Sequence, residues 1–377
     1  MRQQLEQLLK IMDEREGTDL FITVGVPPTL SFRGTTETIS ETVLTPEMAE
    51  GLVHSVMTEE QKSEFLRTKE SNFAINIEGV ARFRISAFYQ RDLVGMVVRR
   101  VQTRIPTIEE LGLRPIVKEL IMEPSGLIIF VGPAGSGKST SLAALLGYRN
   151  AHASGHIITV EDPIEFVHEH DQCIVTQREV SIDTESYEAA LKNTLRQAPD
   201  VVYIGEIRSA QTMEYALAFA ETGHLCVATM HASSASQAVD RVVHFFPTDT
   251  RDQFYLDLSR NLKAVVVQKL IPDAEDTSKV HLADEILLNT PLMAEYIRKG
   301  ETSLIQTLMG KSTELGMRTM DQALFDLFQQ RKISYESAIL HANSSNDLRL
   351  MIKLAAENEG GVPLPSEDQL ASLVLEA

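Results

Sequence analysis

The sequence predicts an α/β fold in two parts, a small α+β unit followed by a larger unit built on a parallel sheet. Its 377 residues exceed the length of one average domain and suffice for two hydrophobic cores. Residues 73–90 alternate between apolar and polar side chains with a period of two, which is typical of paired antiparallel strands. From residue 126 onward, short apolar strands alternate with helical segments, and this order implies a parallel sheet with crossover helices.

The first hundred residues carry the signals of three helices and a mainly antiparallel sheet. Apolar residues between positions 5 and 12 follow helical spacing, and Pro27 and Pro28 mark a turn between two strands. The alternating stretch turns at Glu78-Gly79, so we expect it to form a hairpin. The expected elements are helices at 2–15, about 46–57 and about 59–67, and strands within 17–34, 73–90 and 93–101.

Three prolines between residues 101 and 125 surround two short helical segments, a composition typical of a connector between domains. After the connector, apolar strands are expected at 126–131, 156–160, 201–205 and 225–230, with helices starting near 138, 185 and 209. Beyond 345 the pattern weakens and the segment N-E-G-G-V-P-L-P-S-E-D indicates a mobile tail. The expected divisions are a domain at 1–104, a connector at 105–124, an α/β domain with C-terminal helices at 125–345 and an acidic tail at 346–377.

Composition narrows the classes of function. The formal net charge of −18 argues against a general nucleic-acid binder, because phosphate contacts need a basic surface. Cys173 and Cys226 are far apart and form no C-x-x-C, which excludes a disulfide framework or a four-cysteine zinc site and favours a reducing cytoplasm. No stretch approaches the roughly 18 uncharged residues of a membrane span, so we expect any membrane role to be peripheral, without direct insertion.

Residues 131–140 read V-G-P-A-G-S-G-K-S-T and satisfy the phosphate-binding pattern G-x-x-x-x-G-K-[ST] between a strand and a helix. Glycines let the backbone wrap a polyphosphate, so that its N–H groups and the helix N-terminus face the negative charge. Lys138 is expected to reach the β- and γ-phosphates, and Ser139 to ligate Mg²⁺. The expected nucleotide-binding residues are Gly132, Pro133, Ala134, Gly135, Ser136, Gly137, Lys138, Ser139 and Thr140.

Carboxylates follow two later strands. Glu206 ends the apolar run V-V-Y-I-G, where a carboxylate can hold the water shell of a magnesium ion or polarise the attacking water. Three carboxylates crowd the end of another strand: Glu161, Asp162 and Glu165. This cluster suggests that they bind a metal ion or activate the attacking water, but it also fits a solvated acidic turn.

Two histidines, His224 and His231, lie at the two ends of the apolar strand L-C-V-A-T-M. Either imidazole could approach the terminal phosphate, or serve only as a satisfied core histidine, and the residues alone leave both interpretations open.

Taken in chain order, four stretches resemble the Walker A, Asp box, Walker B and His box of the secretion and type IV pilus ATPases. They are G-P-A-G-S-G-K-S-T, I-T-V-E-D-P-I-E-F, R-Q-A-P-D-V-V-Y-I-G-E-I-R-S and T-G-H-L-C-V-A-T-M-H-A-S-S-A-S-Q-A-V-D-R. The stretches R-F-R-I-S-A-F-Y-Q-R and G-M-R-T-M-D-Q-A-L resemble the PilT/PilU retraction branch, so the likeness covers about residues 1–345. The chain lacks the zinc module common in extension and secretion ATPases. It reads P-L-M-A-E-Y-I-R-K-G where PilT proteins typically have A-I-R-N-L-I-R-E, which makes the PilU type the closer match.

The resemblance implies a cytoplasmic homohexamer, peripheral to the inner membrane at the pilus base, with a PAS-like N-terminal domain and a RecA-like P-loop ATPase domain. It implies ATP hydrolysis that drives retraction and twitching motility, with a PilT-type motor and a membrane platform protein resembling PilC as partners. ATP and Mg²⁺ are the implied cofactors, with Lys138 and Ser139 holding phosphate and metal. Glu161 would activate water, Glu206 would support the metal, and His231 or His224 would sense the γ-phosphate. The arginines proposed to reach nucleotide across a subunit interface are Arg84, Arg99, Arg196 and Arg208.

Three alternatives stay open from the sequence. One is a nucleotide-binding adaptor with little hydrolysis of its own, and another is a pilus-extension or type II secretion ATPase. The third is a DNA-translocating ring, which the acidic charge disfavours.

Overall fold

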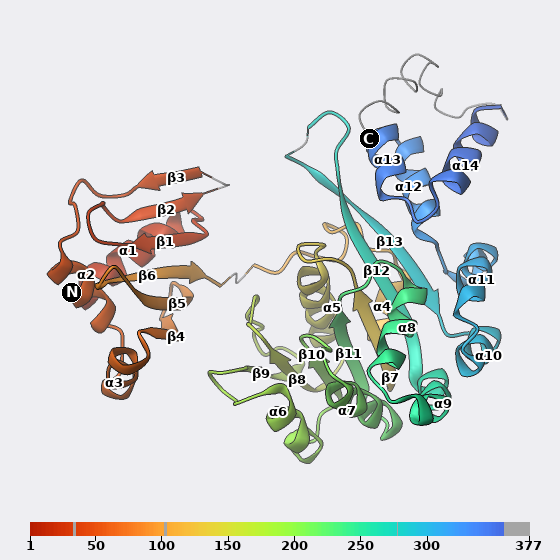
Figure 1. Ribbon diagram of the computed structural model, residues 1–377, viewed down its shortest axis with the longest axis horizontal. Helices are drawn as coiled ribbons and strands as arrows, with labels where there is room; N and C mark the ends of the chain where they lie inside the picture. The colour runs from red at the N-terminus through yellow and green to blue at the C-terminus, as the bar shows by residue number, and fades with distance from the viewer. Residues whose placement is uncertain (33–34, 102–103, 277, 358–377) are drawn as a thin grey trace. The chain divides into compact units, whose positions relative to one another are not determined.

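The computed structural model describes residues 1–32, 35–101, 104–276 and 278–357. Their elements are drawn in Figure 1, and the chain divides into two compact units. The N-terminal unit comprises Met1–Arg104 with Ile164–Val167, and the C-terminal unit comprises Ile105–Pro163 with the residues from His168 onward. Within the described ranges, no helix combines the length and the apolar character needed to cross a bilayer.

The N-terminal unit is a six-stranded antiparallel sheet with three helices, in agreement with the predicted fold class. The strand order is β3-β2-β1-β6-β5-β4, and β4 and β5 form the predicted hairpin. Thr58 caps the N-terminus of α3, and Gln61 completes the capping box. The strands are β1 Asp19–Ile22, β2 Thr29–Phe32, β3 Thr35–Thr38, β4 Glu70–Ile77, β5 Ala81–Gln90 and β6 Leu93–Arg100. The helices are α1 Arg2–Glu14, α2 Pro46–His54 and α3 Glu59–Thr68.

The C-terminal unit is built on a seven-stranded sheet in the order β13-β12-β7-β11-β10-β8-β9. All neighbouring strands run parallel except β12 and β13, which form a long antiparallel hairpin. The mostly parallel sheet confirms the predicted α/β fold of this unit. The strands are β7 Gly126–Val131, β8 Gly155–Glu161, β9 Cys173–Glu179, β10 Val201–Ile204, β11 Leu225–Met230, β12 Leu262–Pro272 and β13 Val280–Leu288.

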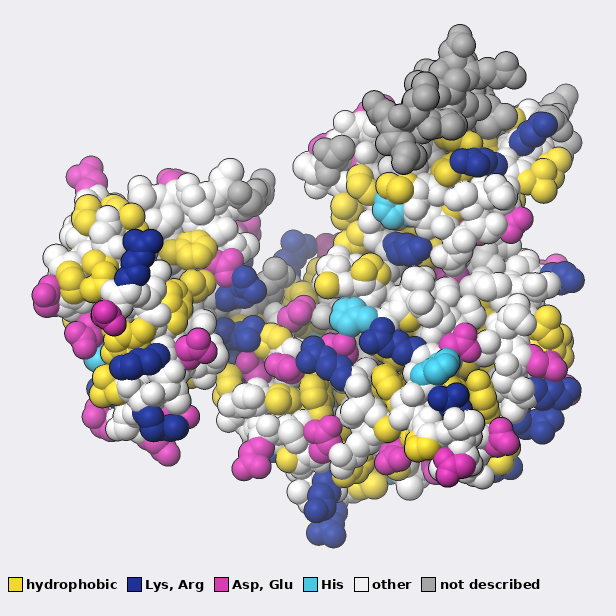
Figure 2. Space-filling view, viewed as in Figure 1, with side chains coloured by type: hydrophobic (Ala, Val, Ile, Leu, Met, Phe, Trp, Pro, Cys, Tyr) yellow, Lys and Arg dark blue, Asp and Glu magenta, His cyan; other side chains and the backbone are white. Residues whose placement is uncertain are grey.

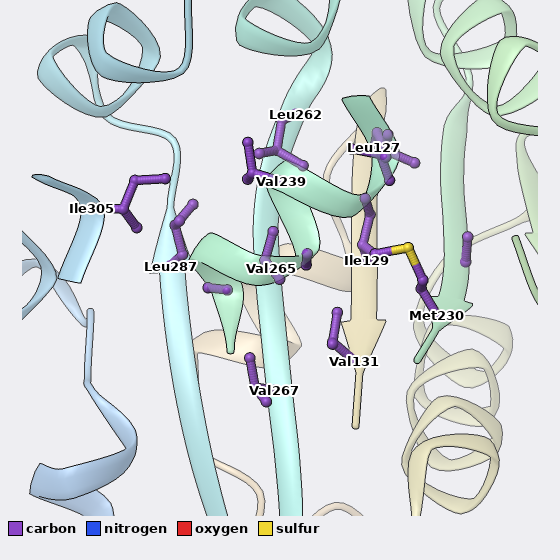
Figure 3. Packing of buried hydrophobic residues seen from close by; sticks show 14 of the residues in the cluster. Leu127, Ile129, Val131, Met230, Val239, Leu262, Val265, Val267, Leu287 and Ile305 are labelled. Atoms are coloured by element: carbon purple, nitrogen blue, oxygen red, sulfur yellow. The ribbon is translucent and has the colours of Figure 1, made fainter. Parts of the chain in front are cut away.

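Helices cover both faces of this sheet, so alternate residues of one strand enter different cores. In β7, Ile129 and Val131 join one hydrophobic cluster while Ile128 and Phe130 join the other. Figure 3 shows part of the first cluster, where side chains of β7, β11, β12 and β13 meet Val239 of α8. The helices are α4 Ile116–Ile121, α5 Lys138–His152, α6 Tyr187–Thr194, α7 Ala210–Glu221, α8 Ala235–His244, α9 Arg251–Asn261, α10 Pro291–Lys299, α11 Ile305–Lys311, α12 Met320–Gln329, α13 Tyr335–His341 and α14 Ser345–Glu357.

The C-terminal helices extend further than the sequence indicated. The acidic tail was expected from residue 346, but α14 is helical to Glu357 and lies beside α12 and α13 (Figure 1). Leu348 and Ile352 are fully buried, and this burial stabilises a helix whose own pattern is weak. Residues 358–377 of the expected tail lie outside the described residues.

Charges of both signs are mixed on the face of the molecule that Figure 2 shows. On each unit, Lys and Arg side chains stand among Asp and Glu side chains rather than in one continuous patch on that face. Such mixing gives no extended basic surface there for a nucleic-acid backbone.

Candidate functional site

The carboxyl ends of four parallel strands meet at one edge of the C-terminal sheet. Val131 of β7 pairs with Met230 of β11, and Ile204 of β10 pairs with Ala228 of β11 and Val160 of β8. The residues that follow these strands therefore lie close together, as expected for ligand sites in parallel sheets. They are the phosphate loop after β7, Glu161 at the end of β8, Gly205-Glu206 after β10 and His231 after β11.

The phosphate loop runs from the buried strand β7 into the N-terminus of α5. A Cβ atom at Gly132 would lie 2.5 Å from Ser136 Oγ and closer still to the carbonyl oxygen of Gln268, so only glycine fits there. Gly137 has φ of +85°, in the left-handed region that glycine adopts without strain. Lys138 is 9% exposed, and its ammonium donates to the carbonyl oxygens of Gly132 and Pro133 at 2.8 Å each. The ammonium is thereby held inside the loop.

His231 joins the phosphate loop to a strand-end carboxylate. Its Nδ1 lies 3.1 Å from the carbonyl oxygen of Gly132, and its Nε2 lies 3.4 Å from Glu206 Oε1. The carbonyl can only accept, so Nδ1 is the donor in that contact. Arg241 of α8 donates to the backbone oxygen of His231 at 2.8 Å, which fixes the residue from a second side.

Arg208 neutralises the acidic side chains that the strand ends bring together. Its Nη2 lies 2.6 Å from Glu206 Oε2, and its Nη1 lies 3.7 Å from Asp162 Oδ2. The hydrogen bond to Glu206 raises the pKa of Arg208 and so reinforces its permanent charge. Of the three carboxylates predicted to crowd this strand end, Asp162 faces Arg208 together with Glu206, whereas Glu165 belongs to the segment Ile164–Val167 of the N-terminal unit.

Glu161 is oriented by two donors on one of its oxygens. Thr159 Oγ1 donates to Glu161 Oε1 at 2.6 Å, and Gln177 Nε2 donates to the same oxygen at 3.1 Å. The side chain is only 8% exposed, so these bonds hold a carboxylate that is largely shielded from bulk water. Gln177 is itself fixed, because the backbone N–H of His168 donates to its Oε1 at 2.8 Å.

Tyr187 of α6 is a further side chain at this edge that the sequence analysis did not select. The structure places its hydroxyl against Gly205, where a Cβ atom would lie 2.7 Å from it. Burial raises the pKa of Tyr187 above its usual range, and the nearby carboxylates of Asp162, Glu161 and Glu206 add to that shift. Tyr187 therefore stays a neutral hydrogen-bonding group beside the acids.

Two other candidates lie at the opposite edge of the same sheet. His224 precedes β11, where its Nδ1 contacts Thr222 Oγ1 at 3.0 Å and the oxygen of Phe219 at 3.2 Å. Arg196 is exposed in the short 3-10 turn Leu195–Gln197, which leads to the amino end of β10. Of the two histidines, only His231 is brought to the phosphate loop of its own subunit, and a role of Arg196 across a subunit interface stays a prediction.

The remaining arginines belong to the N-terminal unit. Arg84 of β5 and Arg99 of β6 are directly opposite each other across the strand pair. Arg99 Nε lies 2.7 Å from Asp19 Oδ1, and this hydrogen bond raises the pKa of Arg99. Opposed like charges disfavour pairing unless an acid compensates, which Asp19 does for Arg99. Their predicted role at a neighbouring subunit's nucleotide stays a prediction.

Comparison with known proteins identifies the family. The family model described as "Type II/IV secretion system protein" matches residues 22–345. The chain belongs to this family. Membership makes it an ATP hydrolase of the secretion ATPase class, as the resemblance of its motifs indicated.

Similar proteins place the chain in the pilus branch of the family. The "Type IV pilus ATPase PilU" of Pseudomonas aeruginosa is 55% identical over 370 residues, which cover 98% of this chain and 95% of that protein. The "Type IV pilus retractation ATPase PilT" of the same organism is 37% identical over 334 residues, covering 89% of this chain and 96% of that protein. The crystal structure of the pilus retraction motor PilT with bound ADP aligns at a TM-score of 0.85 with 35% identity, covering 91% of this chain and 99% of that one. The chain is thus a PilU-type pilus ATPase related to the PilT retraction motor.

Proposed function

We propose that the chain works as an ATP-driven ring motor of type IV pilus retraction, the PilU-type accessory to a PilT-type motor. The observation that carries this proposal is the position of His231 between the Gly132 oxygen and Glu206. A side chain that contacts both the phosphate loop and a strand-end carboxylate is placed to respond when the γ-phosphate is released by hydrolysis. The similarity to PilU and PilT supports the biological setting.

The residues at the carboxyl edge supply the parts of a hydrolysis site. The loop amides and Lys138 would bind the polyphosphate, and water would attack the γ-phosphorus as its bond to the bridging oxygen of ADP breaks. Glu161 would take the proton of that water, because its carboxylate is oriented by Thr159 and Gln177. Arg208 would hold Glu206 in place and stabilise charge on the phosphate that departs, with His231 beside both groups.

Ser139 and Glu206 would hold a magnesium ion. In the part of the chain that the structure describes, no group of three or more His, Cys, Asp or Glu side chains could form a metal cage. A magnesium ion in a phosphate loop does not need one, because the nucleotide and water supply most of its ligands. When bound, Mg²⁺ would neutralise negative charge on the phosphates.

The adaptor alternative is disfavoured by the side chains present. Lys138 is held inside the loop, Glu161 is shielded and oriented, and Glu206 is paired with Arg208. A subunit that only bound nucleotide would have no need for an oriented carboxylate such as Glu161.

The proposed assembly is a homohexamer at the cytoplasmic side of the inner membrane. Its proposed partners are a PilT-type motor and a membrane platform protein resembling PilC, on the strength of the similarity to pilus ATPases. The experiment is to measure the mass of the purified chain in solution with and without ATP, together with its turnover. A nucleotide-dependent hexamer that hydrolyses ATP is the expected result, whereas a ring that binds ATP without turnover would establish the adaptor.

A further inference from the structure

A fully buried carboxylate lies on β13, outside the site described above. Glu285 is 0% exposed and accepts four hydrogen bonds, two on each oxygen. Oε1 accepts from the backbone N–H of Ala235 at 2.6 Å and from Gln306 Nε2 at 3.1 Å. Oε2 accepts from the backbone N–H of Met320 at 3.1 Å and from Asn343 Nδ2 at 3.0 Å. One side chain therefore fastens four separate segments of the C-terminal unit.

The arrangement around Glu285 suits a carboxylate and little else. Burial raises the pKa of Glu285, and the donations from Ala235, Met320 and Gln306 oppose that shift. All four neighbours donate, so an amide at this position would direct its own N–H groups against donors. Ala235 and Met320 are the first residues of α8 and α12, whose N-terminal N–H groups have no partner within the helix.

One of the four segments leads directly to the phosphate site. Ala235 lies four residues after His231, at the start of α8. The Arg241 side chain, farther along α8, donates to the backbone oxygen of His231 at 2.8 Å. The helix is thus connected to His231 by the chain and by a side chain, which gives a displacement of His231 a direct route to α8.

The other three segments lie among the C-terminal helices. Gln306 belongs to α11, Met320 begins α12 and Asn343 lies in the turn before α14. Asp321 strengthens this group, because it accepts the backbone N–H groups of Asn343 and Ser344 at 2.7 and 3.0 Å. Beside them lies a cavity of about 570 Å³, whose lining includes Ser234, Gln306 and Asn343 and which gives these segments room to shift.

We propose that Glu285 is the positioning residue that couples the phosphate site to the C-terminal helices α11, α12 and α14. A change at His231 moves the start of α8, and Glu285 transmits the movement because it holds α8 and the three other segments at one point. The inference rests on the proposed function, in that His231 must respond to the terminal phosphate. Small shifts at one site can become movements of whole packed elements, because packed cores do not deform continuously.

The test is hydrogen–deuterium exchange on the full chain with Mg²⁺ and either ADP or the non-hydrolysable analogue AMP-PNP. In the wild type, we expect exchange in 305–311, 320–329 and 345–357 to differ at least about twofold between the two nucleotides. In Glu285→Gln, both nucleotides should still protect 132–140, but the difference in the C-terminal helices should disappear. A residue that merely stabilised the fold would speed exchange equally with both nucleotides and leave their difference intact.

The matched control is Asp284→Asn, on the same strand. Asp284 is 3% exposed, and its Oδ1 accepts from Arg318 Nη1 at 3.2 Å rather than from α8. This variant loses a buried charge but should keep the nucleotide-dependent difference. Where Glu285→Gln fails to fold, the double variant Gln306→Ala/Asn343→Ala replaces it, and the difference should then vanish in α11 and α14.

Three results would overturn the inference. The first is equal exchange with ADP and AMP-PNP in the C-terminal helices of the wild type. The second is an exchange difference between the nucleotides that survives in Glu285→Gln or in the double variant. The third is loss of that exchange difference in Asp284→Asn as well. A wild-type chain whose residues 132–140 gain no protection from either nucleotide would instead overturn the proposed function.

Discussion

The two ends of the parallel strands carry similar side chains but use them differently. At the carboxyl edge, the side chains converge on the phosphate loop. Lys138 and His231 contact the carbonyl oxygen of Gly132 at 2.8 and 3.1 Å, and His231 lies 3.4 Å from Glu206. At the amino edge, polar residues form separate local pairs. Asp200 accepts the N–H of His156 at 2.7 Å, and Lys263 lies 2.9 Å from Glu123.

The difference follows from strand direction rather than residue type. In a parallel sheet each crossover helix begins near the carboxyl edge, so helix N-termini gather there and favour negative ligands. At the amino edge, the same residue types only close turns and cap chain ends. We therefore pair each substitution at the carboxyl edge with a similar one at the amino edge. The comparison tests whether ATP is hydrolysed at the carboxyl edge.

Substitution of the loop lysine should give the largest difference between the edges. Lys138→Ala removes the buried ammonium that would neutralise the transferring phosphate, so kcat/KM for ATP should fall by about 10³-fold or more. Lys263→Ala removes a partly exposed ion pair with Glu123 and should leave turnover within about twofold. The measurement is steady-state phosphate release by both variants. If Lys138→Ala hydrolysed ATP at the wild-type rate, the phosphate loop would have no part in the mechanism.

Substitutions of the acidic residues at the two edges should differ nearly as much in their effect on kcat. Glu161→Gln keeps the size of the side chain but loses the proton acceptor, so kcat should fall by about 10²- to 10³-fold while ATP still binds. Asp200→Asn at the amino edge should lower thermal stability slightly and leave kcat unchanged, because its carboxylate only accepts the N–H of His156. Single-turnover kinetics and nucleotide titration separate the two effects. Equal losses of kcat in both variants would count against Glu161 as the base.

The two histidines of β11 provide a third pair. His231→Ala removes the hydrogen bond to Gly132 and the contact with Glu206 and should lower kcat by about 10-fold, the upper value for a neutral hydrogen bond. His224→Ala removes contacts to Phe219 and Thr222 only, so its kcat should match the wild type. The measurement is kcat at saturating ATP. A larger loss for His224→Ala would place a catalytic role at the amino edge, across a subunit interface.

Much of this site could be predicted from the sequence because it is local. The loop motif follows a strand and precedes a helix, and Glu161 and Glu206 each end an apolar strand run. The residues alone do not choose between His224 and His231, although strand direction contains the signal: a residue that precedes a parallel strand lies at the amino edge.

The supporting residues could not be predicted, because their partners are distant in sequence. Gln177 reaches Glu161 from β9, a strand that the sequence analysis did not identify. Glu285 gathers donors from segments that lie 50 residues before it and 58 residues after it. Helix α14 was missed for a related reason, since burial of Leu348 and Ile352 by other helices stabilises it.

The smallest expected difference concerns two threonines. Thr159→Val keeps the shape of a side chain that is 1% exposed and removes one of the two donors to Glu161 Oε1. Because Gln177 still donates to the same oxygen, kcat should fall by only about 2- to 10-fold, and stability should fall modestly because a shielded carboxylate loses one of its donors. Thr222→Val at the amino edge removes bonds to the backbone oxygens of Ala218 and Phe219 and to His224, and should leave kcat unchanged. If Thr159→Val turned over ATP at the wild-type rate, the bond from Thr159 would not be needed to orient Glu161, and Gln177→Leu in the same background should then lower kcat.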